Sequence, residues 1–237
     1  MPALKLSLVI PCYNEAANLP LLVTRCRALV ASANAEVILV DNGSSDATPD
    51  VMARELRGEP AIRSVRVEVN KGYGHGIRAG LDAATGDVIG WTHADLQTDP
   101  MDAARSLRLF EASQTPEVLF VKGRRYARPL SDQVFTAGMS VFETLLMGRV
   151  LRDVNAQPTL FHRDTHAAWD NPPDDFSLDL FALANAKRKG LDVKRIPVLF
   201  PERIHGQSSW NVDWDAKRKF IKRTLDYSFR LRRTLSA

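Results

Sequence analysis

Residues 36–41 read EVILVD and decide the fold class of this chain. Four apolar residues in a row between two acidic ones are typical of a short buried strand. Ahead of it, residues 5–10 (KLSLVI) form a second β-rich run, and residues 16–33 carry apolar side chains at helical spacing. After it, Asp46 or Thr48 can cap a further helix. This order of strand, helix, strand and helix predicts βαβ units.

The same alternation continues along the first half of the chain. Residues 64–69 and 87–92 predict the third and fourth strands, and residues 76–84 predict a helix that stops at Gly86. The second half is less regular. There we expect strands at residues 118–122 and 192–200, helices at 131–151 and 176–189, and loops at 153–161 and 203–211. Together these elements predict one α/β domain with a mostly parallel central sheet and helices on both faces.

Polar residues follow each of the four strands predicted in the first half. In chain order they are Asn14 and Glu15, Asp41, Asn70 and Lys71, and finally His93 and Asp95. The carboxyl ends of parallel strands meet at one edge of a sheet, where such folds bind their ligands. The sequence therefore predicts a ligand site at that edge.

Composition limits the class of protein. The chain has 237 residues, of which 45% are hydrophobic and 25% charged, so it can bury a core and is neither disordered nor collagen-like. Cys12 and Cys26 are too few for a disulfide scaffold or a Cys-rich zinc site, and they favour a reducing compartment. Because the sequence shows neither a secretory signal nor an apolar run of about 18 residues, we expect a cytoplasmic protein.

The positive charge is concentrated at one end. Residues 216–237 contain eight basic residues and one acidic residue, a net +7, so the remainder of the +4 chain is mildly acidic. An acidic body argues against nucleic acid as the partner. On a helical wheel, residues 217–235 separate into a basic and an apolar side. Such a helix lies either on an anionic membrane surface, with or without a membrane partner subunit, or against the body of its own protein.

Four motifs occur in an order that resembles the family 2 glycosyltransferases, which have a GT-A fold. They are VIPCYNE (9–15), VDNGSSD (40–46), NKGYGHGIRAGL (70–81) and HADLQTDP (93–100). Later stretches, GRRY (123–126), DVNAQPTLF (153–161) and ERIHGQSSWN (202–211), look like the dolichyl- and polyprenyl-phosphate sugar synthases. The resemblance implies a Rossmann-like GT-A domain over residues 1–211 and a basic helix over 212–237. It also implies inverting transfer of a sugar from a nucleotide-diphosphate sugar to a polyprenyl phosphate.

The resemblance assigns the nucleotide-sugar site to the strand ends. The residues concerned are Pro11, Tyr13, Glu15, Asp41, Asn70, Lys71, Gly72 and Asp95. Asp41 would accept hydrogen bonds from the base or ribose, and the alternative is an Asx turn. Glu15 could instead stabilise the start of the next helix. The glycines of residues 70–76 would let backbone N–H groups approach the phosphates, although their spacing differs from that of the NAD-binding fingerprint.

His93, Asp95 and Gln97 occupy the place of the family's DXD motif, which holds a divalent cation on the sugar diphosphate. Such a cation neutralises the charge that develops on the leaving diphosphate. The resemblance therefore implies Mn²⁺ or Mg²⁺. His93 stands where the family has an aspartate, and imidazole suits Mn²⁺ better than Mg²⁺, so the identity of the metal stays open.

The acceptor side comes from the second half of the chain. For a phosphate acceptor the resemblance offers Arg124, Arg125, Asn155, Gln157, Arg203 and Ser208, whereas the arginine that the family places in the next helix is missing from residues 130–140. A hydroxyl acceptor, as in cell-surface polysaccharide synthesis, would need a carboxylate base. Asp175 and Asp179, four residues apart, are then the catalytic candidates beside Asp95, or else they form an exposed acidic helix face. His93 and the missing arginine also leave open a non-catalytic nucleotide-sugar-binding subunit.

Overall fold

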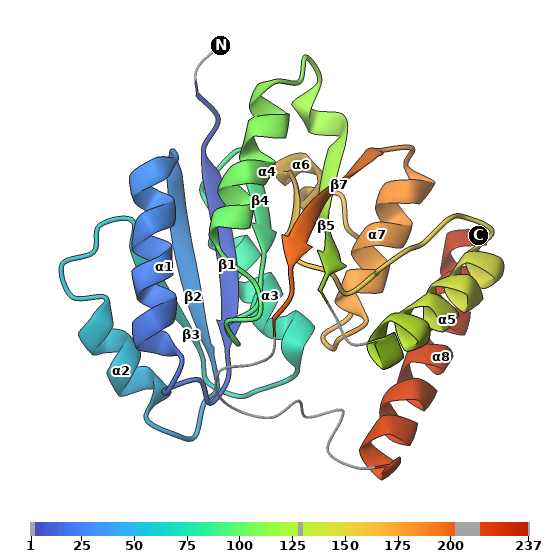
Figure 1. Cartoon of the computed structure of the whole chain (residues 1–237), viewed down its shortest axis with the longest axis horizontal. Coiled ribbons are helices and arrows are strands. Elements are labelled where there is room, and N and C mark those ends of the chain that lie inside the picture. Colours follow the sequence, from blue (N-terminus) through green and yellow to red (C-terminus); the bar gives the residue numbers. More distant parts are fainter. Residues whose placement is uncertain (1–2, 128–129, 202–213, 237) are drawn as a thin grey trace.

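The structure is a computed structural model that describes residues 3–127, 130–201 and 214–236. The strands are β1 (Leu6–Cys12), β2 (Ala35–Asn42), β3 (Ile62–Val67), β4 (Val88–Trp91), β5 (Leu119–Tyr126), β6 (Thr159–His162) and β7 (Asp192–Leu199). They form one sheet in the order β3-β2-β1-β4-β6-β5-β7 (Figure 1). β6 pairs antiparallel with β4 and β5, and all other pairs are parallel. The predicted α/β class and the mostly parallel sheet are confirmed.

The prediction of a loop over residues 153–161 is wrong at its end. β6 begins at Thr159, and its short segment TLFH is held on both sides, with Leu160 opposite Gly90 of β4 and opposite Val121 of β5. Gly90 is needed there, because a Cβ atom at this position would lie 1.9 Å from the carbonyl oxygen of Thr159. β6 thus joins two parallel halves of the sheet.

Helices cover both faces of the sheet. They are α1 (Leu19–Ser32), α2 (Thr48–Glu55), α3 (Tyr73–Asp82), α4 (Met101–Glu111), α5 (Leu130–Met147), α6 (Arg163–Ala167), α7 (Leu178–Arg188) and α8 (Trp214–Ser236). One core contains the apolar faces of α1 and α4, and the other those of α3 and α7 (Figure 1). The sequence analysis predicted neither α4 nor α6.

α8 docks on the body of the protein beside α5 (Figure 1). Phe229 of α8 meets Phe142 of α5 edge-to-face, with ring centroids 6.2 Å apart, and Leu231 and Ser228 are buried. Five basic residues of α8 are exposed: Arg218, Lys222, Arg230, Arg232 and Arg233. The structure shows α8 docked on the body with these basic side chains still exposed, so contact with a membrane surface stays a prediction. The proposed boundary at residue 212 lies outside the described residues. No helix within the described parts of the chain has the length and apolarity to cross a membrane.

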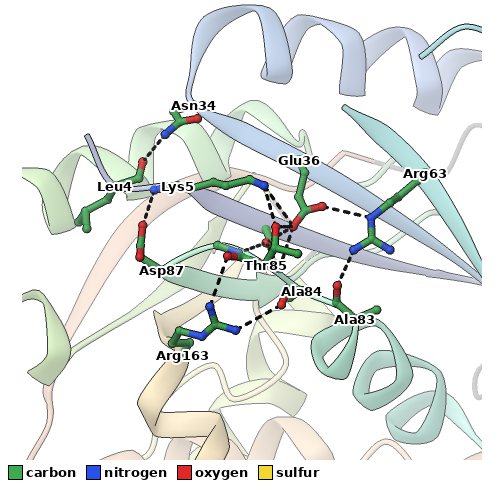
Figure 2. A network of polar contacts seen from close by, with 12 residues as sticks. Leu4, Lys5, Asn34, Glu36, Arg63, Ala83, Ala84, Thr85, Asp87 and Arg163 are labelled. Carbon is green, nitrogen blue, oxygen red and sulfur yellow. Dashed lines mark hydrogen bonds and ion pairs between the residues drawn. The ribbon is translucent and has the colours of Figure 1, made fainter. Parts of the chain in front are cut away.

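The amino edge of the sheet holds a polar network centred on Glu36 (Figure 2). The Glu36 carboxylate accepts hydrogen bonds from Ser7 at 2.7 Å and from the backbone N–H and hydroxyl of Thr85 at 2.9 and 2.6 Å. Arg63 donates to its other oxygen at 3.2 Å. Although burial alone would raise it, these bonds lower the pKa of Glu36 to about 2. The network ties β1, β2 and β3 to the turn before β4.

Candidate active site

The loops at the carboxyl ends of β1 and β2 are hydrogen-bonded to each other. The side-chain oxygen of Asn14 accepts from the N–H groups of Ser45 and Asp46 at 2.9 and 3.3 Å, and the hydroxyl of Ser44 accepts from the N–H of Asn14 at 3.1 Å. Asn14 has a φ of 57°, a left-handed conformation that asparagine tolerates. The first two predicted strand ends therefore converge on one edge.

Around these loops lie the first residues of the predicted nucleotide site. Tyr13 is half exposed, and Pro11 is partly buried in β1. Glu15 accepts a hydrogen bond from Asn18 at 2.6 Å, beside the start of α1. Asp41 is buried at the end of β2, where it accepts from the N–H of Ser44 at 3.0 Å and from Arg66 at 2.9 Å. Asp41 thus binds the N–H three residues on, not two as in an Asx turn. It also makes an ion pair with Arg66 that the sequence did not indicate.

The glycines of residues 70–76 let another stretch of backbone approach. A Cβ atom at Gly72 would lie 2.4 Å from the carbonyl oxygen of Asp174, and one at Gly74 would lie 2.5 Å from that of Pro173. The N–H of Gly72 donates to the side chain of Asn70 at 2.8 Å. The approach of these glycines to a phosphate stays a prediction. Asn70 and Lys71 are exposed at this edge.

The loop after β4 presents the residues at the DXD position. Asp95 is 7% exposed and accepts from the N–H of Gln97 at 3.2 Å. Leu96, between them, has a φ of 61°, a strained conformation of the kind that often occurs at functional sites. The amide nitrogen of Gln97 donates to the carbonyl oxygen of Pro201 at 2.9 Å. This contact joins the loop to the end of the strand β7.

A stack of three rings runs from this loop toward the second half of the chain. His93 stacks on Tyr73 with ring centroids 5.7 Å apart, and Tyr73 stacks on Phe176 at 4.6 Å. Burial raises the pKa of the Tyr73 phenol, and the carboxylates of Asp179 and Asp95 raise it further. Tyr73 therefore stays an uncharged hydroxyl between the loop after β4 and the segment before α7.

The Asp179 carboxylate belongs to a buried hydrogen-bond network. It is 1% exposed and accepts hydrogen bonds from Lys122 at 2.9 Å and from Gln157 at 2.8 Å. Lys122 also donates to Thr159 at 2.6 Å. Asp175 lies outside the helix, because α7 starts at Leu178, and it accepts from the N–H of Ser177 at 2.9 Å. The prediction that Asp175 and Asp179 share one helical face is therefore wrong, as is that of an exposed acidic face.

The predicted acceptor residues separate into four groups. Gln157 is buried and bonded to Asp179. Arg124 is exposed, whereas Arg125 is ion-paired with Asp153. Arg125 and Asn155 line a cavity of about 60 Å³ among α5, α8 and the segment before α7. Phe176 also borders this cavity, which we call the α5 pocket, together with Ser140, Glu143 and Thr224. Arg203 and Ser208 lie outside the described residues.

The sequence analysis did not select Tyr73, Lys122 or Glu143. Lys122 could have been found from the sequence, because a lysine within the apolar run of β5 needs a buried anion as its partner. Glu143 could have been found in the same way, because it is the charged residue in the largely apolar segment VFETLLM of α5. Tyr73 could not have been found from the sequence, since its role depends on rings from two distant segments.

Residues 7–169 match the model of "Glycosyl transferase family 2". The chain belongs to this family. The matched region includes β1 through β6 and hence every strand end at the donor edge, so the resemblance inferred from the motifs is confirmed.

Related proteins cover parts of the chain. The undecaprenyl-phosphate 4-deoxy-4-formamido-L-arabinose transferase of Yersinia enterocolitica is 37% identical over 111 residues, which are 45% of this chain and 34% of that protein. Its counterpart from Aeromonas hydrophila is 40% identical over 103 residues, 42% of this chain and 31% of that protein. This chain therefore matches about a third of the length of these curated relatives.

Solved structures share the fold over nearly the whole chain. Glucosyl-3-phosphoglycerate synthase from Mycobacterium tuberculosis, in complex with Mn²⁺, UDP-glucose and phosphoglyceric acid, superposes with a TM-score of 0.76 at 18% identity. The match covers 97% of this chain and 80% of that one. The same enzyme with UDP gives a TM-score of 0.75. The fold is thus GT-A, as the motifs predicted.

Proposed function

We propose that this protein is an inverting glycosyltransferase that moves a sugar from a nucleotide-diphosphate sugar to a polyprenyl phosphate. Membership of the family supports the reaction class. The names of the matched relatives, undecaprenyl-phosphate transferases, support the acceptor class. The observation that carries the proposal is the convergence of Asp41, His93 and Asp95 at one edge of the sheet, beside a pocket lined by the second half of the chain.

The nucleotide lies, in this proposal, at the ends of β1 and β2. A base or ribose that contacts Asp41 takes over the hydrogen bond that Arg66 now donates, and the half-exposed Arg66 side chain can turn aside. Pro11, Tyr13 and Glu15 border the same place, and the exposed Lys71 faces the diphosphate as a cation. These assignments follow the family motif position by position.

A divalent cation fits this site only if it is shared with the substrate. No group of three potential protein ligands occurs among the described side chains. Asp95 and His93 supply a carboxylate and an imidazole, and Gln97 adds an amide. Mg²⁺ and Mn²⁺ in such sites take their remaining ligands from substrate phosphates and water. The cation supplies the positive charge that stabilises the leaving diphosphate.

The acceptor phosphate needs no strong base. Its second pKa is about 6, so it is largely ionised at pH 7. An acceptor phosphate oxygen forms a bond to the anomeric carbon as the bond from that carbon to the diphosphate oxygen breaks. The electron pair leaves with the nucleoside diphosphate, and attack from the opposite side inverts the configuration. Since Asp179 is paired with Lys122 and Gln157, we assign it to support of the site rather than to proton removal.

We further propose that α8 brings the enzyme to an anionic membrane surface, where a polyprenyl acceptor resides. Its five exposed basic residues support this, with each worth about 1 kcal/mol near such a surface. Sedimentation with phosphatidylserine vesicles tests the proposal. The double variant Arg230→Glu/Arg233→Glu should lose binding, and Arg188→Glu on α7 should not. Equal binding by all three proteins would refute it.

Release of nucleoside diphosphate from a panel of sugar nucleotides, with Mn²⁺ and a short polyprenyl phosphate, tests the main proposal. Asp95→Asn should slow turnover by about 10²–10³-fold, as expected for the loss of one preorganised charge. Asp192→Asn, at the opposite end of the sheet, is the matched control and should be fully active. Nucleotide binding without turnover on any acceptor would favour the binding-subunit alternative.

A further inference from the structure

Glu143 lies in an unusual position for a carboxylate. Thr136, Met139, Ser140 and Glu143 recur at helical spacing on α5 and form one wall of the α5 pocket. The Glu143 side chain is thus directed into a cavity rather than into solvent, and the residue is only 4% exposed.

No hydrogen bond or ion pair from the described residues reaches this carboxyl group. The neighbouring carboxylates differ. Asp153 is paired with Arg125, Asp175 accepts from Ser177, and Asp179 is paired with Lys122. Burial alone raises the pKa of Glu143 to about 7. The Glu143 oxygens are not among the fully enclosed side-chain atoms that lack a partner, so they face the cavity itself. A ligand in the cavity can therefore reach them in place of water.

The surroundings of Glu143 suit a small anionic head group. The α5 pocket also presents the hydroxyls of Ser140 and Thr224 and the amide of Asn155. Its volume of about 60 Å³ holds several water molecules or a group such as a phosphate. Phe176, on its border, is the end of the ring stack that leads through Tyr73 to His93. The pocket therefore adjoins the place where the donor diphosphate is proposed to lie.

We propose that the α5 pocket binds the phosphate of the acceptor and that the uncharged carboxylic acid of Glu143 donates a hydrogen bond to one of its oxygens. This inference rests on the proposed function and adds to it a residue that determines acceptor binding. An O–H donor to a charged oxygen makes one of the short, strong hydrogen bonds. Ionisation of Glu143 removes that donor and places a negative charge against the phosphate.

The charged groups near the α5 pocket do not change the expectation that Glu143 is uncharged when it donates to the phosphate. On β5 the charge of Arg125 is balanced by Asp153, and ahead of α7 lies the carboxylate of Asp175. On α8, burial raises the pKa of Tyr227 well above its usual range, so this phenol stays uncharged near neutrality. Among the described residues, Glu143 is therefore the group of this pocket that titrates near neutrality.

The test measures the KM for a short polyprenyl phosphate from pH 6 to pH 8.5 at saturating donor. In the unmodified protein the KM should rise with pH about tenfold more than in Glu143→Gln, which keeps an N–H donor at every pH. Glu143→Leu lacks a donor and should show a raised KM that depends on pH no more than that of Glu143→Gln. Glu111→Gln, at the end of α4, is the matched control. The KM of the donor sugar nucleotide should be unchanged throughout.

Direct binding of the polyprenyl phosphate at pH 6 and pH 8 separates the two proposals. Binding that weakens with pH only when Glu143 is present supports this inference even if no transfer occurs, in which case the proposed function alone fails. Identical pH profiles for the unmodified protein and Glu143→Gln would overturn the inference, as would an absence of binding. Loss of kcat in Glu143→Gln at unchanged KM would also overturn it, because Glu143 would then act as a base toward a hydroxyl acceptor.

Discussion

Two buried glutamates at opposite ends of the fold have opposite electrostatic surroundings. Glu36, at the amino edge of the sheet, is 7% exposed and has four hydrogen bonds from three partner residues, which lower its pKa to about 2 (Figure 2). Glu143, in the α5 pocket, is 4% exposed, and burial raises its pKa to about 7. Similar burial thus gives opposite shifts, and the difference lies in the partners.

Glu36 stabilises the fold through its partners, whereas Glu143 is proposed to bind a ligand. The partners of Glu36 come from three other parts of the chain, so its carboxylate links these segments at the amino edge of the sheet. Asp179 shows that the other end of the molecule can also satisfy a buried carboxylate, through Lys122 and Gln157. That Glu143 has no such partner among the described residues is therefore a property of the pocket.

The largest expected effect comes from Lys122→Met. The change leaves Asp179 as a buried charge without its cation and should lower the free energy of unfolding by about 3–5 kcal/mol. Urea denaturation at pH 7 measures it. The double variant Lys122→Met/Asp179→Leu should recover most of the loss. A cost below about 1 kcal/mol for the single variant would show that partners matter less than the comparison requires.

Glu36→Gln should have a smaller effect that depends on pH. Because the pKa of Glu36 is lowered in the folded protein, its stabilising contribution is present above the unfolded value of 4.5 and is lost as the pH falls toward about 2. We expect a loss of about 2 kcal/mol at pH 7, discounted for the partly exposed Arg63. Urea midpoints at pH 7 and pH 3 should show the loss shrinking. A loss that is the same at both pH values would contradict the assignment.

Glu143→Gln should have the smallest effect, and with the opposite dependence on pH. The raised pKa of Glu143 means that the folded protein loses stability as the pH rises from 4.5 through about 7. Relative to the unmodified protein, the variant should gain about 1–2 kcal/mol between pH 5 and pH 8. Thermal melts at both pH values measure this gain, and Glu111→Gln serves as the control. Without such a gain, Glu143 would have a partner in solution after all.

The part of the fold built from local signals could be predicted from the sequence. The run EVILVD marks β2 because it is buried on both faces, and the apolar strands β1 and β4 are buried in the same way. β3, at the edge of the sheet, is only partly buried. β6 escaped prediction because its four residues become a strand only through partners on both sides. α4 escaped because much of its buried face consists of small residues, Ala103, Ala104 and Ser106.

In the candidate site, too, local signals were predictable and distant contacts were not. Asp41, His93 and Asp95 were predictable, since they follow strands directly and occur in family motifs. The partners that alter their interpretation were not, because they come from distant segments: Arg66 on Asp41, and Tyr73 on His93. The burial of Asp179 depended on a lysine in another strand. Spacing within one helix carries no information about such a contact.

The docking of α8 also affects the order of assembly. The α5 pocket has walls that run from Arg125 on β5 to Thr224 on α8. Residues 6–199 supply all seven strands of the sheet, whereas this corner of the pocket stays open until α8 has docked. The ends of β1, β2 and β4, by contrast, come from residues before 100, and only later contacts such as the bond from Gln97 to the carbonyl oxygen of Pro201 need the second half of the chain. A folding chain can therefore form these strand ends before it closes the α5 pocket.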